Sequence, residues 1–235
     1  MNRRSTPEVD FGIYLRGLGL LLRHPAIIVV PLLAALVSVL LAQVGQFFTD
    51  PLGSAGGGII SFLQQLAFGF AFGVATLYAN DLQRGYRTNF DSVWNEALGR
   101  AGAILMATVG FVFVISVAAT VGSLLGAVGV YGLQLVAAFF LIYTIPAGAI
   151  SGLPGPLAIS ASIRAVREAP FGTALLAIAF VLLWNVVPQL LLAVPFDLSV
   201  PVTLLIFAIA RALILAYLAF PFAKLYDDVA FTRRW

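Results

Sequence analysis

The chain has 235 residues, of which 61% are hydrophobic and only 10% charged, with a formal net charge of +3. A soluble domain carries about 25% charged residues, so this composition excludes a water-soluble globular protein and indicates a polytopic membrane protein. The chain contains no Cys and a single His, which excludes disulfides, thiolate catalysis and iron–sulfur clusters and argues against a histidine-ligated metal. We therefore expect no cofactor and no metal.

Six apolar stretches are long enough to cross a membrane, since a helix needs about 20 apolar residues to span the hydrocarbon core. The charge-free stretch between Arg100 and Arg164 would extend ~95 Å as one helix, so it must fold back, and the glycine-rich segment LLGAVGVYG is the natural turn. The sequence therefore predicts an all-α fold in one integral membrane domain, residues 1–235. The predicted spans are about 26–48, 59–79, 102–124, 131–150, 171–193 and 201–223.

The basic residues are confined to alternate loops. Twelve of the thirteen Lys and Arg residues fall before the first span, between spans two and three, between spans four and five, or after span six. The opposite loops, near 50–58, 125–130 and 194–200, hold only Asp50 and Asp197 as charged residues. Because positively charged loops stay in the cytoplasm, we expect both termini to be cytoplasmic.

Each pair of spans follows a short amphipathic stretch, at about residues 8–23, 89–100 and 156–168. Such helices favour the membrane interface with their apolar side toward lipid. We interpret the pattern as three hairpins in one orientation, related by a pseudo-axis along the membrane normal, although any six-span protein with basic inner loops would show the arginines. The expected anchors to anionic lipid of the inner leaflet are Arg16, Arg23, Arg100, Arg164 and Arg167.

The last 85 residues resemble a known family. The segment GLPGPLAISASIRAVREAPFGTALL and the end KLYDDVAFTRR are similar to the membrane domain fused to some bacterial glycerophosphodiester phosphodiesterases, and to related stand-alone six-span proteins. The resemblance implies a bacterial inner-membrane location and a link to membrane lipid. It implies no hydrolysis, because the family has no catalytic residues in its membrane part and the soluble phosphodiesterase domain does not occur in this sequence. Asp228 is also followed by Val229 rather than the usual basic residue.

One cation, Arg211, falls at the centre of the sixth apolar stretch, LLIFAIARALILAYLAF. About 18 Å of helix separates it from one end of the span and about 15 Å from the other, which is too far for its side chain to reach the interface. Burial at this depth costs about 2.5–3.5 kcal/mol. Arg211 therefore needs a partner, and its neighbours on the same helix offer none.

The fifth span offers neutral acceptors. Counting from a turn near Leu198 places Asn185 at the depth of Arg211, and Gln189 shares the face of Asn185 at i, i+4 spacing. Pro188 lacks a backbone N–H and so frees a carbonyl one turn earlier. Arg211, Asn185 and Gln189 then form either a structural clamp between the last two spans or a site for a lipid phosphate or substrate carboxylate. A partner subunit's acid is a further alternative.

Glutamines gather in the outer halves of the predicted spans. Their amides could line a polar vestibule that opens outward, or could simply lie near lipid headgroups, where amides are tolerated. The residues are Gln43, Gln46, Gln64, Gln65 and Gln134.

Small residues and prolines mark two further features. Gly69 and Gly73 form a GxxxG pattern, which favours close packing between helices. The stretch TIPAGAISGLPGPL (144–157) is either a broken helix that lines a cavity or a redirection of the chain into the third interfacial helix. No phosphate loop, dinucleotide fingerprint or metalloprotease motif is present in the sequence.

These observations favour a non-enzymatic membrane protein. The leading hypothesis is a structural or accessory protein, alone or as a subunit of a membrane complex, in contact with anionic lipid and with no nucleic acid. The alternative is a transporter or lipid-handling protein with an anion or lipid-headgroup site around Arg211.

Overall fold

The computed structural model describes residues 12–86, 88–193 and 200–231, and in these stretches every regular element is a helix. Six segments are long and apolar enough to cross a membrane, so the predicted all-α, six-span architecture is confirmed. The segments are Pro25–Gly45, Gly56–Gln83, Ala101–Ser123, Gly126–Ser151, Pro170–Leu190 and Val202–Ala230.

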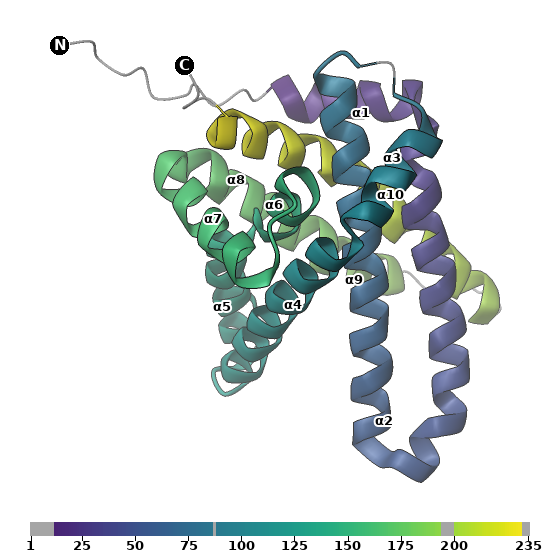
Figure 1. Ribbon diagram of the computed structural model, residues 1–235. Coiled ribbons are helices and arrows are strands. Elements are labelled where there is room, and N and C mark those ends of the chain that lie inside the picture. The colour runs from purple at the N-terminus through teal and green to yellow at the C-terminus, as the bar shows by residue number, and fades with distance from the viewer. Residues whose placement is uncertain (1–11, 87, 194–199, 232–235) are drawn as a thin grey trace.

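The first two spans form a hairpin within one helical segment, α2 (Val29–Gln83), which follows a short 3-10 turn, η1 (Pro25–Ile28). Figure 1 shows α2 doubling back on itself. The amide of Gln64 donates to the carbonyl of Ser38 at 2.8 Å, and a Cβ on Gly45 would lie 3.1 Å from Ile60. These pairs are centred at residues 51 to 53, so the chain reverses within the predicted loop near 50–58.

The second hairpin joins α4 (Ala101–Ser123) to α5 (Gly126–Leu141) through a tight turn. Gly126 adopts a φ of +75°, a conformation that L side chains rarely adopt. The helices are in backbone contact next to the turn, because a Cβ on Gly122 would lie 2.6 Å from the carbonyl oxygen of Gly129. The glycine cluster therefore makes the turn, as the sequence predicts.

The fourth span is broken near its end. The helix stops at Leu141 and restarts as α6 (Thr144–Ser151), in which residues 144–150 are all buried. Ser162, on α7 (Gly155–Glu168), bridges the break. Its buried hydroxyl accepts a hydrogen bond from the N–H of Tyr143 at 3.1 Å and donates to the carbonyl of Phe140 at 2.8 Å. The span thus breaks just before the proline-containing stretch 144–157, and that stretch leads into α7.

The third hairpin consists of α8 (Pro170–Val181), a π-helical turn η2 (Leu182–Val186), α9 (Val187–Ala193) and α10 (Val200–Phe231). The N–H of Val187 donates to the carbonyl of Leu182 rather than to the residue four positions earlier. Pro188 follows at once and has no N–H to continue the normal ladder. The last helix runs beyond the predicted end at residue 223 and includes the LYDDV segment.

Two of the predicted interfacial helices are α1 (Gly12–Arg23) and α3 (Phe90–Gly99). They lie beside the hairpins at one end of the molecule, and we call this end the basic end (Figure 1). On α1, Leu15, Leu18 and Leu22 are exposed, as expected for a face in lipid. On α3, Val93 and Ala97 are buried against the protein instead. The third interfacial helix is α7.

Close packing of small residues joins α2 to α4. A Cβ on Gly69 would lie 2.1 Å from the side chain of Thr108, and one on Gly73 would lie 2.6 Å from Ile104. The GxxxG pattern is therefore an intramolecular seam. The same part of α2 packs on α10, where the rings of Phe72 and Phe222 meet edge to face at 4.9 Å.

Candidate functional site

A cavity of about 410 Å³ lies among α2, α4, α5, α8, η2 and α10, in the halves of the spans away from the basic end. Its volume is in the range of small-molecule sites. No Asp or Glu lines it, and Arg211 is its one charged lining residue. The cavity therefore carries a net positive charge inside a bundle of apolar helices. Its polar lining residues are Ser61, Gln64, Gln65, Ser116, Gln134, Asn185 and Arg211.

The guanidinium of Arg211 lies among three aromatic rings. Its Cζ is 5.7 Å from the ring centroid of Phe68, 5.3 Å from that of Trp184 and 5.2 Å from that of Phe207. The expectation that its own helix offers no partner is wrong for Phe207, one turn earlier, which supplies a π-face rather than a hydrogen-bond acceptor. Arg211 thus links α10 to α2 and to the π-helical turn.

These rings stabilise the charge but accept no hydrogen bond from its Nε. Cation–π contacts contribute up to about 2 kcal/mol each when desolvated, comparable to the ~2.5–3.5 kcal/mol cost of a central arginine. The Nε of Arg211 is nonetheless buried without a hydrogen-bond partner. Among the described residues, only Tyr14 and Thr144 have other buried side-chain atoms in that state, and both are neutral hydroxyls.

The two predicted partners of Arg211 behave differently. Asn185 lines the same cavity as Arg211, which agrees with the depth expected from the turn. Gln189 does not line it, and its Oε1 instead accepts a hydrogen bond from the hydroxyl of Tyr131 at 2.9 Å. Trp184 contributes its ring to the site.

Three of the five predicted vestibule glutamines line the cavity: Gln64, Gln65 and Gln134. Gln64 also ties the two halves of α2 together through Ser38, and Gln65 donates to the hydroxyl of Ser61 at 3.3 Å. Gln43 is exposed and does not line the cavity. The side chain of Gln46 lies outside the described part of the structure.

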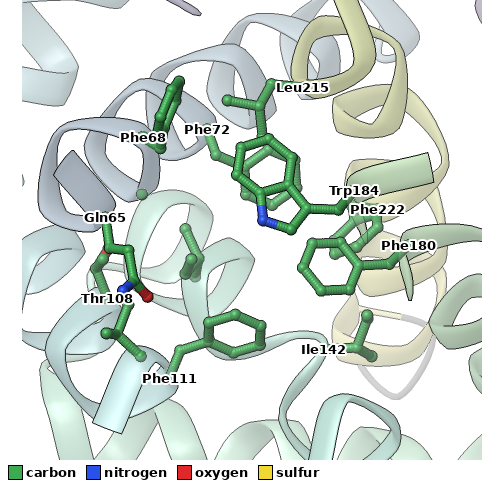
Figure 2. Close-up of a pocket in the computed structure, with 13 residues that line it drawn as sticks. Gln65, Phe68, Phe72, Thr108, Phe111, Ile142, Phe180, Trp184, Leu215 and Phe222 are labelled. Atoms are coloured by element: carbon green, nitrogen blue, oxygen red, sulfur yellow. The ribbon is translucent and has the colours of Figure 1, made fainter. Parts of the chain in front are cut away.

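A smaller apolar chamber of about 70 Å³ adjoins the cavity (Figure 2). Figure 2 shows the rings of Phe68, Trp184, Phe180 and Phe111 around it, with the amide of Gln65 at its edge. The two spaces share these five residues and Val112.

Polar groups in the small chamber are few. Thr108 also lines it, but its hydroxyl donates to the carbonyl of Ile104 at 2.8 Å and so is already paired. A charged polar space and an apolar space therefore meet at Phe68 and Trp184, directly beneath the guanidinium of Arg211.

The aromatic partners were missed in the sequence analysis. Phe207 could have been found, because it precedes Arg211 by four residues and so shares its face. Phe68 comes from a helix distant in sequence, and nothing in the local pattern indicates it. Ser61 and Ser116 also line the cavity, and no pattern in the sequence singles them out.

Four of the five predicted headgroup anchors are exposed at the basic end: Arg16, Arg23, Arg164 and Arg167. Arg100 is not available in the same way. Its Nη1 donates to the carbonyls of Ala149 and Ile150, each at 2.7 Å, and its Nη2 lies 2.8 Å from Glu96. It therefore holds the end of α6 against α4.

A second polar pocket of about 360 Å³ opens at the basic end, lined by both acids and arginines. Arg84, which lines this pocket, pairs with Asp227 on α10, and this hydrogen bond raises the pKa of Arg84. Because Glu96 also balances Arg100 here, the charges of this pocket are largely matched, in contrast to those around Arg211.

Comparison with protein-family models, curated proteins and solved structures gave no match for this chain.

Proposed function

We propose that this protein binds an anion within the membrane, in the cavity around Arg211, and acts as a transporter or lipid-handling protein. The observation that carries the proposal is an arginine whose buried Nε has no hydrogen-bond partner, in a cavity with no lining carboxylate. An anion beside Arg211 in the cavity would balance this charge. Arginine suits a carboxylate or phosphate, because its planar fork can donate two parallel hydrogen bonds.

The surrounding groups fit the same ligand class. The amides of Gln64, Gln65, Gln134 and Asn185 can each donate or accept, so they suit the neutral polar parts of an organic anion. The π-helical turn that carries Asn185 and Trp184 supports the proposal further, because such turns occur frequently at functional sites.

The test is anion-dependent stabilisation of the purified protein. A ligand that binds only the folded state stabilises it by about 2.7 kcal/mol when present at 100 times its Kd. We would measure the unfolding temperature with a panel of phosphate, sulfate and short-chain carboxylates, in wild type, Arg211→Gln and Arg164→Gln. Arg164 is exposed at the basic end and serves as the control for loss of one positive charge.

We expect at least one anion to stabilise wild type and Arg164→Gln but not Arg211→Gln. Native mass spectrometry of the gently solubilised wild type should also show a bound anionic molecule that Arg211→Gln lacks. If Arg211→Gln folds and every anion acts equally on all three proteins, the proposal is wrong.

The proposed location is the bacterial inner membrane, with the basic end in the cytoplasm, as the positive-inside rule and the family resemblance imply. The cavity would then lie in the outer half of the bilayer. The accessory-subunit hypothesis and the absence of enzymatic activity stay predictions from sequence.

A further inference from the structure

We infer that the ligand at Arg211 is a small amphiphilic anion whose short, unbranched apolar end occupies the chamber of Figure 2. The inference rests on the proposed function and adds the chemical class of the ligand. An inorganic anion could use Arg211 but would leave the apolar chamber empty. A neutral apolar molecule could fill the chamber but would leave the guanidinium unbalanced.

The two chambers are joined at the correct point for such a ligand. Phe68 and Trp184 line both spaces, their rings meet edge to face at 5.3 Å, and both lie under the guanidinium of Arg211. A carboxylate or phosphate bound to Arg211 therefore has apolar ring surface next to it on one side. On its other side it has the amides of the larger cavity.

The apolar chamber lies deeper toward the basic end than Arg211. Leu215 and Phe222, which line it, follow Arg211 along α10 by four and eleven residues. Phe222 lines this end, with the ring of Phe72 at 4.9 Å and that of Phe180 at 6.1 Å. The apolar end of the ligand thus points toward the basic end, and its remaining polar groups face the larger cavity.

The size of the chamber limits the apolar group. Its volume of about 70 Å³ is well below the ~150 Å³ of an engineered cavity that binds benzene. We therefore expect the chamber to favour a chain of two or three carbons over an aromatic ring or a long acyl chain. This size favours a soluble organic anion over a membrane lipid.

The experiment measures the affinity of straight-chain carboxylates, from acetate to decanoate, for the full chain in nanodiscs at neutral pH. Trp184 lines the site, and the chain has three Trp residues in all, so Trp94→Phe and Trp235→Phe leave its fluorescence as the signal. Butanamide serves as the uncharged analogue of butanoate. Arg211→Gln in the same background corrects for carboxylates that partition into the lipid.

Two matched variants on α4 test the position of the apolar end. Phe111→Leu enlarges the chamber, because the ring of Phe111 lines it and meets that of Phe180 at 5.9 Å. Phe113→Leu makes the same change two residues away, where the ring is 66% exposed and lines neither chamber.

We expect Arg211-dependent affinity to rise about fourfold per methylene, the equivalent of ~0.8 kcal/mol, and to stop rising near propanoate or butanoate. Butanamide should bind at least tenfold more weakly than butanoate. Phe111→Leu should move the plateau to a longer chain, whereas Phe113→Leu should leave it unchanged.

Other outcomes overturn the inference in distinguishable ways. Equal Arg211-dependent affinities for acetate and butanoate would leave the anion site standing but remove its apolar part. Affinity that rises steadily to decanoate would identify a long-chain lipid as the ligand. If no carboxylate binds in an Arg211-dependent manner and the anion panel also fails, the proposed function falls with the inference.

Discussion

Replacement of Ser162 by Ala tests the broken fourth span most directly. The side chain is fully buried, with 0% of its surface exposed, and its hydroxyl serves both sides of the break. The substitution removes one acceptor and one donor but almost no volume. It leaves the N–H of Tyr143, 3.1 Å from the lost oxygen, without that acceptor in the interior.

The expected cost is the desolvation of an unpaired donor, about 1–3 kcal/mol. Hydrogen bonds between membrane helices average only about 0.6 kcal/mol, because side chains find other partners in the unfolded state within the membrane. The N–H of Tyr143 is a backbone group held at a helix break, so we expect the larger value. Ser162→Ala should lower the free energy of unfolding in mixed detergent–SDS micelles by about 1–3 kcal/mol.

Ser160→Ala is the matched control on the same helix. Ser160 is exposed, and its hydroxyl bonds only to the carbonyl of Leu157, at 2.9 Å. Exposed substitutions of this kind change stability by about 0.5 kcal/mol at most. If Ser162→Ala and Ser160→Ala differ by less than this amount, the hydroxyl does not support the break and our account of α6 is wrong.

Two further predictions concern the seam and the orientation. Gly69→Ala should destabilise the fold by about 1–3 kcal/mol through overpacking, whereas Gly58→Ala, whose Cβ meets nothing within 4 Å, should not. The same unfolding assay should show partial rescue by Thr108→Ala, which removes the two closest atoms, and no rescue would refute the contact. The orientation is tested in cells with a maleimide that cannot cross the membrane. Leu124→Cys, at a hairpin tip where Leu124 is 83% exposed, should react with reagent added outside, whereas Ser160→Cys should react only after permeabilisation. The reverse pattern would show that the proposed topology is inverted.

The sequence was sufficient for the six spans because each rests on a long run without charge. No membrane protein can place many unpaired ionised side chains in lipid, so the charges alone mark the loops. Structural details inside the spans were harder to predict from the sequence. The break after Leu141 depends on Ser162, whose role appears only when α7 has been placed beside α5.

The candidate site could likewise be predicted only in part. The depth of Asn185 relative to Arg211 follows from counting residues on either side of a turn, and the structure lines one cavity with both. The contact of Gln189 with the hydroxyl of Tyr131 does not follow from counting, because Tyr131 lies on α5, 58 residues away in the sequence.

The bridge made by Ser162 also bears on the order in which the chain assembles in the membrane. Its partner N–H, on Tyr143, is synthesised 19 residues earlier, so the fourth span enters the bilayer before its break can be closed. An N–H left open in hydrocarbon costs several kcal/mol. The α4–α5 hairpin is therefore an incomplete intermediate on its own, and a ribosome stalled before Ser162 should leave it exposed to membrane quality control.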